Sequence, residues 1–205
     1  MRLELDNLRF YQFHEVDSWS PSVVARMVLV NKIGELYNTD NSFRKLLPAE
    51  LRKRPPLVLS GSSMQLERFP GIYVHIGSYG ERQYLSPSYR IGKEFGPEIS
   101  SVLMADLRAD FVTIAESLVQ RDHLVSSLLL ALKSFLPGYY VVEAQGFNYV
   151  VVIGPFSGEV NLALEETVGV YSVFSATVSV SLTVVGGTIE HGFDMLFKVL
   201  YGASG

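Results

Sequence analysis

The longest regular pattern in the chain is an alternation of apolar and polar residues between positions 173 and 185. Apolar side chains recur at every second position, and the positions between them carry hydroxyls: Ser175, Thr177, Ser179, Ser181 and Thr183. A period of two predicts a β-strand, here longer than the usual ~5–6 residues. We expect one face of this strand to pack on a core and the other to be polar but uncharged.

Two other stretches follow the helical period. Between Val23 and Tyr37, apolar residues recur at spacings of one, three and four, which predicts a helix over about 21–38. Ser20-Pro21 suits its start, because serine can cap free N–H groups and proline fits the first helical turn. A second amphipathic helix over about 118–135 is predicted by leucines that stack four residues apart: Leu124, Leu128 and Leu132.

The remaining elements are shorter. A helix is predicted over 42–54, ended by Pro55-Pro56. The apolar stretch 192–200 suits a short C-terminal helix. Runs of apolar and β-branched residues predict further strands over 72–76, 99–106, 110–116, 139–143 and 147–153.

These elements predict an α+β fold and a single domain over residues 1–205. We expect a mixed or antiparallel β-sheet packed against one long amphipathic helix (about 118–135), with an N-terminal helix (about 21–38) and a short C-terminal helix. Residues 1–60 are expected to form an N-terminal helical subregion, and residues 192–205 a C-terminal interaction tail.

Composition excludes several classes of protein. Of the 205 residues 48% are hydrophobic and 19% charged, the latter below the usual ~25%. The absence of cysteine excludes a disulfide framework, a cysteine zinc site and a cysteine nucleophile. No signal-peptide pattern opens the sequence and no apolar run approaches the ~20 residues needed to cross a bilayer, so we expect a soluble protein without membrane contact.

Charge is unevenly distributed along the chain. The net charge of −4 argues against a general nucleic-acid binder, which usually has a basic surplus. Residues 1–137 hold 16 basic and 15 acidic groups, whereas residues 138–205 hold Lys198 and six acids, a sum of −5. So little charge indicates either surface that a partner covers or a well-buried β-rich domain. One basic cluster suits either phosphate contact or a solvated, salt-bridging helix face: Arg44, Lys45, Arg52, Lys53 and Arg54.

The sequence lacks the motifs of common enzymes. It contains no phosphate-binding loop, no G-x-G-x-x-G and no G-x-S-x-G. Asp122 and His123 are neighbours on a predicted helix, where adjacent side chains do not face each other. We expect no enzymatic activity, no cofactor and no metal site, since metal-binding spacing is missing among the four histidines: His14, His75, His123 and His191.

The segment from Ala109 to Leu136 combines a strand and a helix in a distinctive way. An alternating strand, ADFVTIAES, runs directly into a helix that opens QRDHLVSSLLLAL. This strand, followed by E/Q-R-D-x-L and a leucine-rich helix, resembles a segment of the tail terminator proteins of tailed bacteriophages and of related neck or tail-completion proteins. The order of elements is similar over about 70–205, while the stretch 76–99 and the apolar tail depart from it. The specific matching residues are Arg121, Asp122 and Leu124.

The resemblance implies a sheet packed on such a helix and closed by a late long strand, here FSATVSVSLTVV. It implies a non-enzymatic structural protein of the virion, assembled in the host cytoplasm. Such a protein forms a homo-oligomeric ring, commonly a hexamer, that terminates the tail and joins it to the head. Its other expected partners are adjacent neck, tail-tube or sheath proteins, and DNA that passes through the lumen without sequence-specific binding.

The resemblance gives two sets of residues candidate roles. Glu159, Glu165 and Glu166 are candidates for an acidic lumen, because negative charge repels DNA phosphates and lets the duplex slide. The candidate subunit interface combines the hydroxyl face of the long strand with the apolar tail: Ser175, Thr177, Ser179, Ser181, Thr183, Phe193, Leu196, Phe197 and Leu200. That hydroxyl face is alternatively an ordinary solvent-exposed sheet face.

A different class of protein also fits the composition. A non-viral α+β ligand-binding or adaptor module would need a concave pocket lined by aromatic residues. The sequence offers candidates for such a lining in its middle third: Tyr73, Tyr79, Tyr84 and Tyr89.

Overall fold

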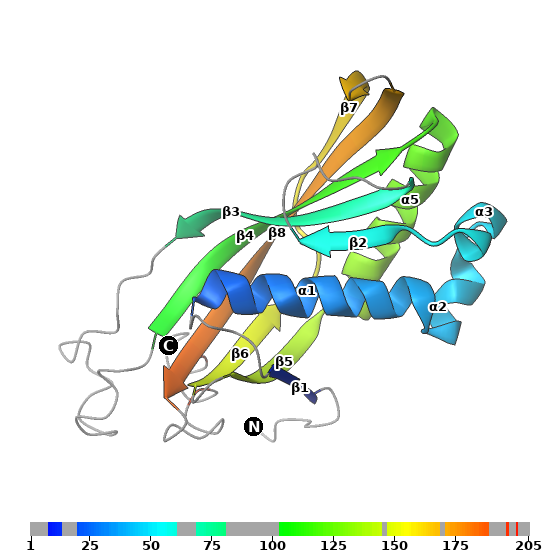
Figure 1. The fold of residues 1–205 in the computed structure, drawn as a ribbon. Helices are drawn as coiled ribbons and strands as arrows, with labels where there is room; N and C mark the ends of the chain where they lie inside the picture. The colour runs from blue at the N-terminus through cyan, green and yellow to red at the C-terminus, as the bar shows by residue number, and fades with distance from the viewer. Residues whose placement is uncertain are drawn as a thin grey trace.

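The computed structural model describes residues 8–13, 20–60, 69–80, 103–144, 147–168 and 171–188, together with Leu196 and Leu200. The chain is an α+β fold with one curled, mixed sheet and few helices, which confirms the predicted class (Figure 1). In chain order the elements are β1 (Leu8–Phe13), α1 (Pro21–Asn38), α2 (Asn41–Leu46), α3 (Ala49–Lys53), β2 (Leu57–Ser60), β3 (Gly71–Gly80), β4 (Leu103–Ala115), α5 (Leu118–Leu130), the π-helical turn η4 (Ala131–Phe135), β5 (Gly138–Ala144), β6 (Phe147–Ile153), β7 (Val160–Val168) and β8 (Tyr171–Thr188).

The long strand β8 lies in the middle of the sheet. The strand order is β1-β5-β6-β8-β4-β3-β2, and β7 also pairs with β8. All of β4 pairs antiparallel with one edge of β8. On the other edge, β6 pairs antiparallel with the stretch from Leu182 to Thr188, and β7 with the stretch from Tyr171 to Val178. β8 therefore joins strands that are far apart in the sequence into one sheet.

Helices α1 and α5 pack on the same face of the sheet, which we call the inner face. Their buried apolar residues form one core with inward-facing residues of β4 and β8 such as Leu107, Phe111 and Val178. The two helices also meet directly, because the hydroxyl of Tyr37 on α1 lies 2.7 Å from that of Ser127 on α5. Burial raises the pKa of the Tyr37 phenol above its ordinary value. The sheet thus packs against both helices rather than against α5 alone.

The ends of the helices differ from the sequence prediction in two places. Ser20 precedes α1 as predicted, but its side chain makes no capping hydrogen bond, and its hydroxyl lies 2.8 Å from that of Ser22. The helix predicted over 42–54 is divided into α2 and α3. Pro48 lies at the division, because proline lacks the N–H that a continuous helix needs and disfavours helical backbone at the residue before it.

The strands also differ from the prediction. β1, β2 and β7 are not predicted by the sequence pattern. Within the described residues, the strands predicted over 99–106 and 110–116 form one strand, β4, because Arg108 projects outward and keeps the period of two. Apart from Leu196 and Leu200, the predicted C-terminal helix lies outside the described residues. None of the helices described is long and apolar enough to cross a membrane.

Candidate functional site

The opposite face of the sheet, which we call the outer face, has apolar ends and a polar centre. One apolar cluster combines strand residues with the C-terminal region: Met104, Val141, Val150, Val185 and Leu196. A second cluster is built on Tyr73, Ile114 and Val173. Between the two clusters, the register of β4 and β8 brings charged residues beside hydroxyls, with Asp106 opposite Thr183, Arg108 opposite Ser181, and Asp110 opposite Ser179.

In the polar centre, hydrogen bonds link the charged residues of β4 to the hydroxyls of β8. The Arg108 guanidinium donates from Nη2 to Ser179 Oγ at 2.9 Å and from Nε to Asp110 Oδ1 at 3.1 Å. Ser179 in turn donates its hydroxyl to the same Asp110 oxygen at 2.6 Å. Thr183 donates to Asp106 Oδ1 at 2.7 Å. The hydroxyls of β8 therefore orient the carboxylates of β4, a role that the sequence of β8 alone does not reveal.

Strands β6 and β7 meet the same edge of β8 one after the other, and a gap separates them. Pairing of β6 ends at Leu182 and pairing of β7 begins at Val178. The segment 154–159 crosses this gap and is fixed by a hydrogen bond of 3.0 Å from the Ser179 N–H to the Glu159 carbonyl. Phe156, in the same segment, packs against the main core. The gap is therefore closed on the inner face by an aromatic side chain.

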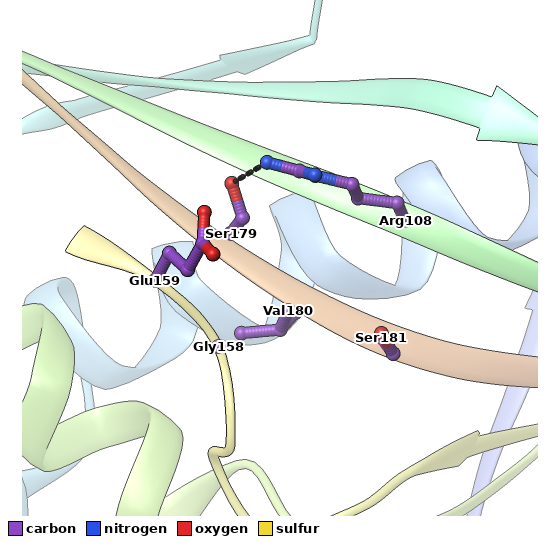
Figure 2. Close-up of a pocket in the computed structure, with 6 residues that line it drawn as sticks. All are labelled: Arg108, Gly158, Glu159, Ser179, Val180 and Ser181. Atoms are coloured by element: carbon purple, nitrogen blue, oxygen red, sulfur yellow. Dashed lines mark hydrogen bonds between the residues drawn. The ribbon is translucent and has the colours of Figure 1, made fainter. Parts of the chain in front are cut away.

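A hollow of about 190 Å³ lies at this gap (Figure 2). Figure 2 shows Arg108 reaching from β4 to Ser179 on β8, with Glu159 near the same serine. The hollow thus offers a guanidinium, a carboxylate and two hydroxyls, which suits a polar group with both donors and acceptors. Because Asp110 already pairs with Arg108, the net charge around the hollow is negative. Its lining residues are Arg108, Gly158, Glu159, Ser179, Val180 and Ser181.

The five predicted hydroxyls of the subunit interface differ in accessibility. Ser175 and Ser179 are buried, at 6% and 7% exposure, within the chain itself. Thr177 and Thr183 are half-buried, and Ser181 is exposed. Three of the five could therefore contact a neighbour directly, whereas the other two are already covered.

The predicted interaction tail is described only at Leu196 and Leu200. Leu196 is fully buried in the apolar cluster that covers one end of the outer face, and Leu200 packs against that cluster. Phe193 and Phe197 lie outside the described residues. The Leu196 side chain is thus already covered by strands of its own chain.

The predicted acidic residues lie at or within β7. Glu159 is exposed at the hollow, just before the strand begins. Glu165 and Glu166 pair with Phe174 and Val173 of β8, but their side chains lie outside the described part of the structure. An acidic lumen made by these residues stays a prediction.

The tyrosines predicted to line a ligand pocket are not brought together in the described structure. Tyr73 is buried in the second apolar cluster, away from the hollow. Tyr79 lies in β3 with its side chain outside the description, and Tyr84 and Tyr89 lie outside it altogether. Among the described residues, no group of three or more acidic or histidine side chains could hold a metal ion.

Part of the basic cluster stabilises the corner formed by the short helices. Arg44 donates to the carbonyls of Asn38 and Arg52 at 3.1 and 3.4 Å. Arg54 lies 3.7 Å from Glu116, and both side chains are half exposed. The Arg54 contact fits the salt-bridging interpretation, whereas Arg44 hydrogen-bonds to main-chain carbonyls of the same corner.

The residues that carry the phage resemblance lie at the start of α5. Leu124 is fully buried in the core. Arg121 is also buried, and its guanidinium donates to Asp122 Oδ1 from Nε at 3.0 Å and from Nη2 at 2.8 Å. This part of the motif therefore has a structural role. In comparisons with known proteins, no family model and no curated protein matches this chain.

Proposed function

We propose that this chain is a non-enzymatic structural protein of a tailed bacteriophage. In this proposal it forms a homo-oligomeric ring, a hexamer, at the neck or tail end of the virion. The ring terminates the tail, joins it to the head and lets DNA pass through its lumen. Adjacent neck, tail-tube or sheath proteins are its other partners.

The main support is the arrangement of β4, α5 and β8. The segment that resembles the phage proteins, 109–136, comprises the end of β4, a turn at Glu116-Ser117, α5 and η4. Both β4 and α5 contact β8, which comes late in the sequence, is 18 residues long and lies at the centre of the sheet. A strand and helix that both contact a late, long strand support the proposal.

The outer face gives a second, physical support. Thr177, Ser181 and Thr183 leave an accessible row of hydroxyls along β8. Uncharged hydroxyls cost less to bury in a subunit interface than lysine or glutamate would, because an ionised group loses more hydration. The charged residues beside this row on β4 are paired within the chain, Asp106 with Thr183 and Asp110 with Arg108, so the face suits a polar contact between copies of the chain.

Assembly of the purified protein tests the proposal. Mass measurement in solution and electron microscopy, on the protein alone and mixed with phage tails, should reveal rings. Ser181→Glu should weaken assembly by placing a charge in the interface, whereas Ser134→Glu, at an exposed serine on η4, should leave it intact. A chain that stays monomeric at high concentration and does not join tails would contradict the proposal.

The hollow favours one alternative, a ligand-binding or adaptor module. Its guanidinium, carboxylate and hydroxyls could hold a small polar molecule. Native mass spectrometry of the protein purified from its source would detect a retained ligand. Repeated spectra that contain the bare chain mass only would count against this alternative.

A further inference from the structure

We propose that β7 is a docking edge for an extended, basic segment of another protein, which adds a strand to the sheet beside it. This role is independent of the proposed ring, because it concerns an edge that the single chain already presents. Its occupant is defined by chemistry: a strand in which lysine or arginine alternates with β-branched apolar residues.

The backbone of β7 has an open edge along the described part of the sheet. The strand is nine residues long and pairs with β8 alone among the described strands. Alternate residues of an edge strand direct their N–H and C=O groups outward, where another strand can bond to them. Proteins usually protect such edges with charged residues, above all lysine, with proline, with β-bulges or by keeping the strand short. β2, at one end of the sheet, has four residues and follows Pro55-Pro56. β7 is longer and contains neither lysine nor proline, but it carries Glu165 and Glu166 and its register shifts between Leu162 and Glu165, so a docking strand must bring opposite charge.

Two apolar side chains of β7 extend the inner face and remain partly exposed. Val160 lies opposite Val178, and Leu162 opposite Ala176, and both partners belong to the main core. Cross-strand pairs share a face of the sheet, so Val160 and Leu162 lie on the inner face as well. They nevertheless remain 37% and 57% exposed. A strand added beside β7 would place its own apolar side chains against them.

The charge around β7 determines which charge a docking strand should carry. Glu159 precedes β7, Glu165 and Glu166 lie in it, and the only basic residue from 138 to 205 is Lys198. A second copy of β7 would bring like charges together, which destabilises a strand pair. A basic strand would bring opposite charges together.

A labelled peptide tests this docking role on the full chain. The probe is a fluorescent seven-residue peptide in which lysine and valine alternate, and the control peptide has glutamate in place of lysine. Fluorescence anisotropy should show binding of the lysine peptide that weakens with added salt. Hydrogen exchange should show new protection in residues 160–168.

Two exposed apolar residues provide matched variants. Leu162→Lys should weaken peptide binding about tenfold, because the leucine no longer contributes buried apolar area and a like charge faces the peptide. Val119→Lys changes an equally exposed residue on α5 and should leave binding unchanged. Glu159→Lys should also weaken binding, and circular dichroism checks that each variant is folded.

Several results would overturn the docking role. The glutamate peptide could bind as well as the lysine peptide, Leu162→Lys could bind as tightly as the wild type, or residues 160–168 could gain no protection. Self-association of the wild type that Leu162→Lys abolishes would identify a second copy as the occupant instead. The two proposals fail separately, because ring assembly should be weakened by Ser181→Glu and self-association through β7 by Leu162→Lys.

Discussion

Replacing Gly158 with alanine should destabilise the protein far more than the same replacement at Gly154. Both glycines lie in the segment that joins β6 to β7. A Cβ on Gly158 would lie 1.5 Å from the carbonyl oxygen of Ser179 and 2.7 Å from its carbonyl carbon. These are backbone atoms of the central strand, which cannot rotate away as a side chain can. A Cβ on Gly154 meets no atom within 4 Å.

Two costs combine at Gly158. Forcing an extra methyl group into packed surroundings costs about 1–3 kcal/mol. Moving the segment away would also strain the hydrogen bond from the Ser179 N–H to the Glu159 carbonyl, and such a bond contributes about 0.5–1.5 kcal/mol. We therefore expect Gly158→Ala to lower the free energy of unfolding by about 2–4 kcal/mol. Gly154→Ala should stay within about 0.5 kcal/mol of the wild type.

Urea unfolding followed by circular dichroism measures both variants. A loss of this size corresponds to a Tm lower by roughly 5–15 °C in a chain of this length. A Gly158→Ala protein as stable as the wild type and as Gly154→Ala would refute the reasoning. It would mean that segment 154–159 is not held against β8, and the hollow would then lack one of its walls.

Three further changes test other parts of the fold. Gly34→Ala, within α1 where a Cβ meets no atom within 4 Å, should stabilise the protein by about 0.5–1 kcal/mol, seen as a higher Tm. Asp40→Ala removes a carboxylate that accepts from two backbone N–H groups at the start of α2, so urea unfolding should show a loss of about 1 kcal/mol, most of it restored in Asp40→Asn. Burial raises the pKa of Tyr37 and Tyr149 above the ordinary value of 10.0, so the unfolded chain ionises first and stability should fall as pH rises above that value. Urea midpoints measured across this pH range should fall less steeply for Tyr149→Phe, and an identical slope would argue against this cause.

Local periodicity was sufficient to predict the long elements. The helix predicted over 21–38 is α1, and the alternation over 173–185 lies within β8. β7 was not predicted, because Glu165-Glu166 interrupts the alternation and the strand exists through pairing with β8. β1 and β2 are short edge strands, and β1 pairs in parallel with the distant β5, whereas β2 pairs with β3, the next strand along the chain.

The polar centre of the outer face depends on relations that no single segment contains. Charged residues at every second position of β4, such as Arg108 and Asp110, could have indicated an outward-facing row. Their hydrogen bonds with Ser179 follow from the register of two strands far apart in the sequence. The hollow also depends on the pairing of β6 and β7 with successive stretches of the same edge of β8. The alternation along β8 predicts the row of hydroxyls but not the charged residues that lie beside it on β4.

The central place of β8 has a consequence for synthesis on the ribosome. Leu103 of β4 pairs with Gly186 of β8, so the middle of the sheet cannot close until β8 has emerged. Until then β4 and β6 each lack the strand that later pairs with one of their edges, β8, and uncovered edges attract other chains. Sheets built from pairings this distant also fold slowly. The nascent chain therefore passes through an aggregation-prone stage, and its yield in cells should depend on chaperones that protect the two edges during translation.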